Sequence, residues 1–225
     1  MEMKALPLQS AVAATIRSSQ SFVDEERAII RAAYPLLARG HPVFVEELSA
    51  YAGVALGSVT RTLERHPGLA HLDLAGRIEG FLGLSLKPTS HRLEIGGRSL
   101  YAWCAWDTLF IPRLVGANAR VTSTCPISGV EIALTATPDG IQDVRPDATA
   151  MSFSSSGCED DPGGVIGAAC HEIHFLASRE AAERWIDTHP HAQTLALREA
   201  WQLAWLFVMV CLGGIHSPEA EQAAS

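Results

Sequence analysis

The apolar positions near the start of the chain recur at helical spacing. Between residues 25 and 38 they lie three or four residues apart, on one face of a helix, at Ile29, Ile30, Ala33 and Leu37. Asp24 before this run and Gly40 after it are typical of a helix start and a helix stop. Two shorter helices are predicted over residues 45–52 and 57–66.

The three predicted helices precede a segment, residues 69–86, that glycines break into hairpin-like pieces. Helix, turn, helix and hairpin is the outline of a winged-helix unit. The third helix offers Arg61 and Arg65 offset by Glu64, a poor set of side chains for reading base edges. We therefore expect a structural, winged-helix-like region over residues 1–88 rather than a DNA reader.

After residue 88 the pattern changes to strands. The Gly-Gly turn at 96–97 predicts a hairpin between residues 91 and 101. Further strands are expected over 119–123, 130–137, 141–144, 151–154 and 170–178, and helices over 102–111, 179–188 and 195–212. Residues 89–225 should thus form a mainly antiparallel sheet domain with flanking helices, and the fold class should be α+β.

Composition and charge narrow the class of protein. The chain has 225 residues, 48% of them hydrophobic, enough for one large core or two small domains. A net charge of −8 argues against a general nucleic-acid binder, which needs a basic face. No secretory signal is recognised, and the longest apolar run, 203–212, is short of the roughly 20 residues of a membrane helix. We expect a cytoplasmic protein with no nucleic-acid or membrane partner.

The cysteines are odd in number and widely spaced, at positions 104, 125, 158, 170 and 211. This does not resemble the dense disulfide framework of a small secreted domain. No pair has the C-x-x-C spacing of a zinc ribbon or a thioredoxin-type dithiol. Cysteines that act together in this chain must be brought together by folding.

Cys104 and Asp107 lie three residues apart among apolar and aromatic neighbours. On a helix this spacing puts both side chains on one face, roughly 5–6 Å apart, as a nucleophile beside its acid or base would be. We expect Cys104 in the first helical turn, where the helix dipole favours a thiolate. A small buried thiol beside a first-turn carboxylate fits the same spacing, so C-x-x-D alone leaves both interpretations open.

Other side chains near these positions have two interpretations. Tyr101, Trp103 and Trp106 would line an apolar pocket for a substrate or pack in the core. His171 and His174 fall on opposite faces of a strand, so we interpret them as packing residues or as supports for a site rather than as metal ligands.

Three blocks of the sequence carry a resemblance to a known family. They are Leu-Tyr-Ala-Trp-Cys-Ala-Trp-Asp-Thr-Leu-Phe-Ile-Pro at 100–112, Ala-Arg-Val with Thr-Cys and Ser-Gly at 119–129, and Cys170 followed by Ile-His-Phe and Ala-Ser. The chain is similar there to the organomercurial (alkylmercury) lyases of bacterial mercury resistance. The similarity extends more loosely over residues 30 to 200.

The resemblance implies that Cys104 and Cys170 are the catalytic thiols, Asp107 is the catalytic carboxylate and Cys125 is structural. The implied reaction is protonolytic cleavage of the carbon–mercury bond of R–Hg⁺ into a hydrocarbon and Hg(II). Mercury(II) is a soft ion that prefers thiolates, so Cys104, Cys170 and Asp107 would hold the Hg(II) product. Low-molecular-weight thiols would be co-substrates, mercuric reductase would receive the ion, and no organic cofactor is implied, since no dinucleotide fingerprint is present.

Two other functions stay open on the sequence. A cytoplasmic metal sensor would bind DNA through the winged helix and hold a soft metal with Cys104, Cys125 and Cys170. A copper- or mercury-binding carrier on the same fold would need the cysteines but not Asp107.

Overall fold

An eight-stranded antiparallel sheet is the largest element of the computed structural model, which describes residues 22–154 and 172–213. Its strands are ordered β1-β2-β3-β5-β4-β6-β7-β8. Their bounds are β1 Ala70–Leu72, β2 Ile78–Phe81, β3 Leu84–Ser85, β4 His91–Ile95, β5 Arg98–Ala102, β6 Ala119–Thr124, β7 Glu131–Thr137 and β8 Gly140–Arg145. Together with the helices below, this mainly antiparallel sheet confirms the α+β fold class.

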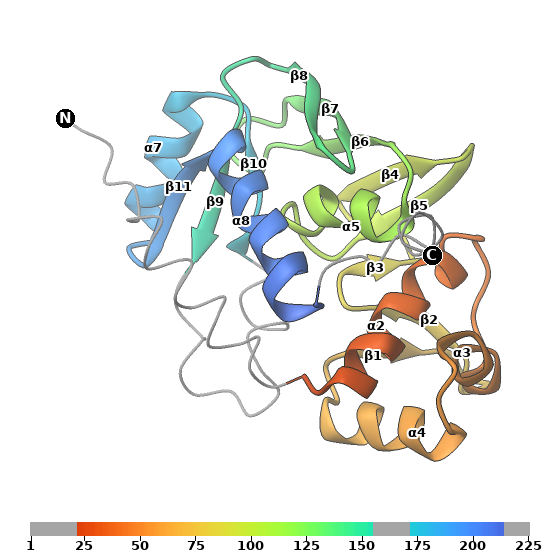
Figure 1. Ribbon diagram of the computed structural model, residues 1–225. Coiled ribbons are helices and arrows are strands. Elements are labelled where there is room, and N and C mark those ends of the chain that lie inside the picture. Colours follow the sequence, from red (N-terminus) through yellow and green to blue (C-terminus); the bar gives the residue numbers. More distant parts are fainter. Residues whose placement is uncertain (1–21, 155–171, 214–225) are drawn as a thin grey trace, which may run out of the picture.

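Three helices precede the sheet in the chain, as the apolar spacing predicted. They are α2 Asp24–Leu37, α3 Val45–Ala52 and α4 Leu56–Arg65, and they lie together against the β1–β3 side of the molecule, in red to orange (Figure 1). Gly53 ends α3 with φ +68, a left-handed conformation that glycine adopts readily. Val43, between α2 and α3, pairs with Ile78 of β2. The winged-helix interpretation of this region stays a prediction.

The large sheet is continuous across the predicted boundary between residues 88 and 89. Strand β3 pairs with β5, with Leu84 opposite Ala102, and β4 pairs with both β5 and β6. The N-terminal strands therefore share hydrogen bonds with the strand that leads into the segment around Cys104. The division into 1–88 and 89–225 stays a prediction.

A second, three-stranded sheet lies beside the first, in the order β10-β9-β11, with two helices (Figure 1). The elements are β9 Ala150–Ser154, β10 Phe175–Leu176, α7 Arg179–Thr188, β11 Ala192–Ala196 and α8 Leu197–Cys211. The side chain of Ser178 accepts a hydrogen bond from the backbone N–H of Ala181 at 3.1 Å, which confirms the expected cap of α7.

The helix expected from residue 195 begins two residues later. Leu195 and Ala196 belong to β11, where they pair with Met151 and Ala150 of β9. A short apolar run fits a buried strand as well as a helix. Here the two residues form a strand because they pair with the edge of β9 that β10 does not occupy. No helix in the described ranges, α8 included, is long and apolar enough to cross a membrane.

The helix expected over residues 102–111 also begins later than predicted. Ala102 is the last residue of β5, residues 103–106 form a turn, and α5 runs from Asp107 to Val115. Cys104 is therefore not in the first turn of a helix. Gly116 ends α5 in the left-handed conformation, as expected.

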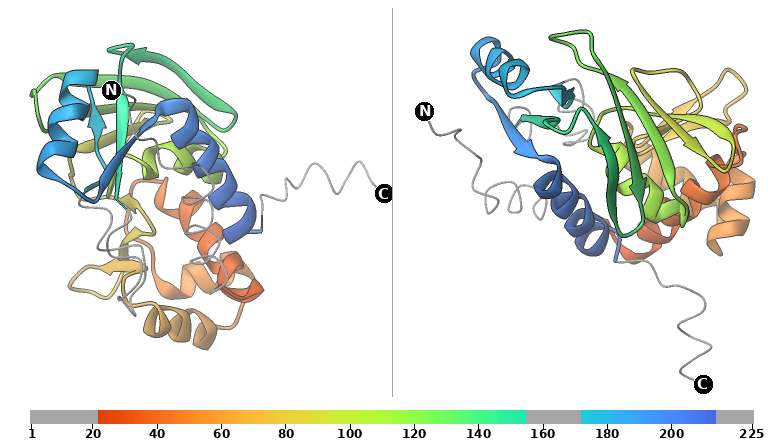
Figure 2. Two further views of the ribbon diagram at one scale, coloured as in Figure 1. Left: turned by 90° about the vertical axis from the view of Figure 1, so that its left-hand side faces the viewer. Right: turned by 90° about the horizontal axis from the view of Figure 1, so that it is seen from above.

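Helix α5 sits at the centre of the packing. It contacts α2, α8 and strand β7, and the two views of Figure 2 place α8 alongside it. Elements from both ends of the described chain thus cover the segment that carries Cys104 and Asp107.

The alternating burial of β4 makes a direct test of the sheet possible. Leu93 is fully buried and Glu94, next to it, faces solvent. Leu93→Ala is expected to lower the free energy of unfolding by about 2–5 kcal/mol, because it leaves a cavity in the core. Glu94→Ala should change it by less than about 0.5 kcal/mol. Urea unfolding of both variants checks this, and equal losses would contradict the register of β4.

Candidate active site

Cys104 lies in the turn that joins β5 to α5, and this turn is anchored on both sides. The backbone N–H of Trp103 donates to the carbonyl of Gly83 at 2.8 Å, and that of Ala105 donates to the carbonyl of Ile173 at 3.1 Å. The Cys104 side chain is buried, 1% exposed. Two segments far apart in the sequence, the β2–β3 turn and the chain before β10, therefore fix the position of the thiol.

Asp107 is the first residue of α5 and returns to contact Cys104. Its Oδ2 accepts the backbone N–H of Cys104 at 2.9 Å, and the Cys104 thiol is hydrogen-bonded to the same carboxyl group. The carboxyl group is itself buried, 5% exposed. The predicted pairing of Cys104 with Asp107 is thus present, although a turn and not a helix produces it.

Burial sets the proton affinity of this carboxyl group. It raises the pKa of Asp107 from 3.8 to about 6, while the hydrogen bonds from the thiol and the backbone N–H of Cys104 act in the opposite direction. A carboxyl group with such a pKa accepts and returns a proton near neutral pH. The pair can therefore take a proton from a thiol and hold it away from water.

Cys170, the third predicted site residue, lies outside the described residues, as does His171. The described chain resumes at residue 172, and Ile173 makes the contact with Ala105 given above. The pairing of Cys104 with Cys170 stays a prediction.

Sequence reasoning did not single out a buried histidine, His91, on β4. Its Nδ1 is hydrogen-bonded to the hydroxyl of Ser123 at 2.9 Å, and its ring lies 6.0 Å from that of His174. Burial, helped by His174, lowers the pKa of His91 to about 3, so this side chain is neutral. The alternation of β4, with His91 on the same face as Leu93, was the signal that would have placed it in the core.

Cys125 begins the turn between β6 and β7 and is buried. Burial favours its neutral thiol, but hydrogen bonds from the hydroxyl of Ser128 and from backbone N–H groups, Ala177 among them, lower the pKa of Cys125. These contacts tie the β6–β7 turn to the end of β10. They give Cys125 a packing environment of its own, in keeping with the structural role that we predict for it.

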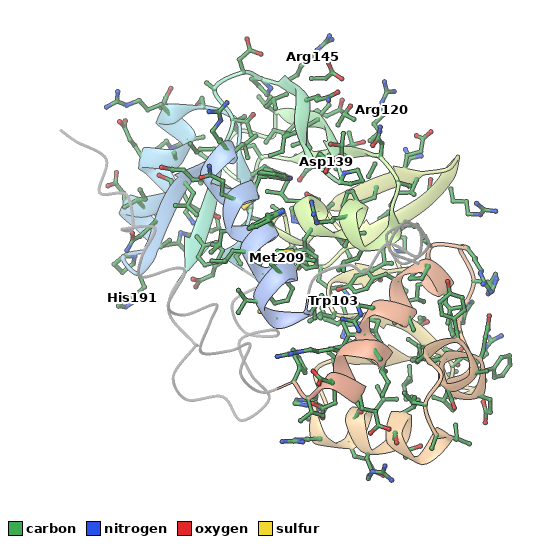
Figure 3. The ribbon with its side chains drawn as sticks, in the orientation of Figure 1. Trp103, Arg120, Asp139, Arg145, His191 and Met209 are labelled. Carbon is green, nitrogen blue, oxygen red and sulfur yellow. The ribbon has the colours of Figure 1, made fainter. Side chains whose placement is uncertain are left out.

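The two tryptophans beside Cys104 have different surroundings. Trp103, labelled in Figure 3, stacks on His71 with ring centroids 4.4 Å apart. Trp106 packs against Phe110, Phe153 and Phe207, and its indole N–H donates to Ala200 of α8 at 3.1 Å. Trp106 is therefore a packing residue that ties α5 to α8.

The raised pKa of Asp107 predicts a pH-dependent stability. Because the folded state binds this proton more tightly than the unfolded chain, stability falls as pH rises from about 4 to about 6 and stays lower above. Asp107→Asn removes the effect and keeps an oxygen for the Cys104 N–H. Between pH 4 and pH 8, the free energy of unfolding of the variant should therefore rise by up to roughly 3 kcal/mol relative to that of the wild type. Urea unfolding across this range checks it, and parallel curves for the two proteins would contradict it.

Comparisons with known proteins identify the family of the chain. The family model described as alkylmercury lyase matches residues 84–208. Alkylmercury lyase of Staphylococcus epidermidis is 37% identical over 175 residues, 78% of this chain and 79% of that protein. That of Pseudomonas putida is 38% identical over 170 residues, 76% of this chain and 78% of that protein.

A solved structure has the same fold. The structure titled as the mercury-bound form of MerB2 superimposes with a TM-score of 0.73 and covers 87% of this chain and 96% of its own, at 24% sequence identity. The family match spans more than half of the chain, and the relatives align over most of both sequences. The chain therefore belongs to the alkylmercury lyase family of enzymes.

Proposed function

We propose that this enzyme cleaves the carbon–mercury bond of organomercurials by protonolysis, with Cys104 and Cys170 as mercury ligands and Asp107 as the proton carrier. The observation that carries the proposal is the buried Cys104–Asp107 pair. Its backbone contact is 2.9 Å long and its carboxyl group has a pKa of about 6.

The proposed reaction begins with capture of R–Hg⁺. One cysteine thiolate displaces the weak ligand on mercury, because the soft ion prefers sulfur. The second thiol adds after it passes its proton to ionised Asp107. The carbon–mercury bond then breaks, its electron pair stays with carbon, and carbon takes the proton from Asp107. The products are R–H and Hg(II) held between the two sulfurs, with Asp107 beside them.

The surroundings of Asp107 suit both halves of this proton transfer. A pKa of about 6 leaves the carboxylate largely ionised at neutral pH, ready to accept the thiol proton. Its burial separates the bound proton from bulk water, so that the mercury-bound carbon is the nearest acceptor. An exposed carboxylate would lose the proton to solvent before transfer.

Chain connectivity supports the part given to Cys170. Ile173 contacts Ala105, the neighbour of Cys104, with an N···O distance of 3.1 Å. Cys170 is three residues from Ile173, and three residues of extended chain span at most roughly 11 Å. This connection permits Cys170 to approach mercury on Cys104, as the proposal requires.

The product must be removed for turnover. Low-molecular-weight thiols are the proposed co-substrates, because Hg(II) between two sulfurs leaves most readily by exchange with other thiols. Mercuric reductase is the proposed acceptor, and a reducing cytoplasm the proposed compartment, since both site cysteines must be thiols. No organic cofactor enters the reaction.

Two alternatives are a metal carrier without lyase activity and a DNA-binding metal sensor. Both would need the cysteines but not Asp107. The hydrogen bond between the Asp107 carboxyl group and the Cys104 thiol therefore favours the lyase over both.

Release of hydrocarbon tests the activity. Wild-type enzyme incubated with phenylmercury and excess thiol is expected to release benzene, measured by gas chromatography. Cys104→Ser and Cys170→Ser should reduce the rate at least about 100-fold, because each removes a thiolate that mercury needs. Cys211→Ala, in α8, is the cysteine control and should retain activity. The absence of benzene from the wild type would overturn the proposed function.

The role of Asp107 has a separate test. Asp107→Asn is expected to slow benzene release about 10²–10⁴-fold, the usual contribution of a proton-transferring group, while the variant still binds one Hg²⁺ per chain. Asp139→Asn is the matched control, since the Asp139 side chain, labelled in Figure 3, is 94% exposed. Undiminished release by Asp107→Asn would remove Asp107 from the mechanism and leave the lyase activity standing.

A further inference from the structure

The carboxyl group of Asp107 is packed on its other side against the backbone of Gly83. Gly83 lies in the β2–β3 turn with φ +92, and a Cβ added there would fall 2.5 Å from Cγ and 2.7 Å from Oδ1 of Asp107. Real Cβ atoms do not approach other atoms so closely. One oxygen of the carboxyl group thus faces Gly83 while the other accepts the N–H of Cys104. Any side chain at position 83 would therefore displace the carboxyl group.

The β2–β3 turn is itself held from three directions. The hydroxyl of Tyr34 donates to the carbonyl of Leu82 at 2.6 Å, and the N–H of Leu82 donates to Leu69 at 2.8 Å. The Gly83 carbonyl accepts the N–H of Trp103, next to Cys104, at 2.8 Å. Leu82 has φ +36, a conformation that is strained for leucine. These hydrogen bonds hold Leu82 in a backbone conformation that leucine does not favour.

Tyr34 reaches this turn from helix α2, far from Asp107 in sequence. Its side chain is fully buried. Burial, and then the negative charge of Asp107, raise the pKa of Tyr34, so its hydroxyl stays protonated as a donor. The turn that Tyr34 holds is the one that borders the carboxyl group of Asp107. Tyr34, Leu82 and Gly83 all precede the segment matched by the family model, which begins at residue 84.

We propose that Tyr34 and the Leu82–Gly83 turn are positioning residues for proton transfer: they hold the Asp107 carboxyl group against Cys104 and close its other face to water. The inference rests on the proposed function. Tyr34 acts on the turn, the turn acts on Asp107, and neither touches the substrate. Loss of this support should slow protonation of carbon and leave the capture of R–Hg⁺ by the thiols intact.

Tyr34→Phe tests the inference with the smallest change, the loss of one hydroxyl group. Benzene release from phenylmercury should slow about 10–100-fold, the usual effect of a small displacement of a reacting group. The rate at which phenylmercury is captured should not change. The enzyme–mercury–phenyl adduct should accordingly accumulate in intact-mass spectra during a single turnover. Tyr51→Phe is the control, since Tyr51, on α3, is 53% exposed, and should behave as wild type.

Gly83→Ala tests the contact with the carboxyl group. Release of benzene is expected to fall more than about 100-fold, again with accumulation of the adduct. Gly76→Ala is the matched control, because Gly76 has φ +75 but nothing within 4 Å of an added Cβ. The control carries the same backbone strain without the collision, and its activity should be close to that of the wild type.

The outcomes separate the two proposals. No benzene from the wild type overturns the proposed function itself. With an active wild type, Tyr34→Phe that slows capture and release equally, or that leaves release unchanged, overturns the positioning role. Should Gly83→Ala fail to fold, Tyr34→Phe alone decides. Slow benzene release with accumulated adduct in Tyr34→Phe, and neither effect in Tyr51→Phe, supports the positioning role.

Discussion

The burial of one carboxyl group beside one thiol is the constraint on which the rest of the site depends. Asp107 is taken out of water and is compensated by the backbone N–H and thiol of Cys104. A buried carboxylate without such partners would be protonated or would destabilise the fold. Here the balance leaves a pKa of about 6, between that of an ordinary aspartate and that of a permanently neutral acid. This intermediate value suits a group that must both accept and give a proton.

Maintaining that environment requires elements from the whole described chain. The β2–β3 turn covers the carboxyl group, α2 supports that turn through Tyr34, and the segment before β10 fixes Ala105. Helix α8 packs against the same segment, where its Ala200 carbonyl accepts a hydrogen bond from the indole N–H of Trp106. Helix α2 therefore contacts the turn that borders Asp107, and in the proposed mechanism it supports the active site. A thiol and an acid that lie three residues apart are held by contacts that span most of the sequence.

Sequence reasoning succeeded where the signal was local. The apolar period gave α2, and the glycines after α3 and α5 marked their ends. The spacing of Cys104 and Asp107 indicated a pair, but periodicity placed Cys104 in a helix, because an apolar aromatic run does not distinguish a turn from a first helical turn. Leu195 and Ala196, the last two residues of β11, were taken for helix for a similar reason, since their partner strand β9 lies about forty residues earlier. Gly83 signals only a turn, and Tyr34 carries no local signal: their part in the site comes from contacts that only the folded chain makes.

The origin of the proton in the hydrocarbon tests the central claim most directly. A single turnover of phenylmercury can be run in heavy water, after the buried acid has exchanged, and the benzene analysed by mass spectrometry together with the mercury on the protein. The account predicts one deuterium per benzene and one Hg(II) retained per chain, with formation of this product slowed in Asp107→Asn. Benzene without deuterium, or mercury bound with no benzene released, would contradict it.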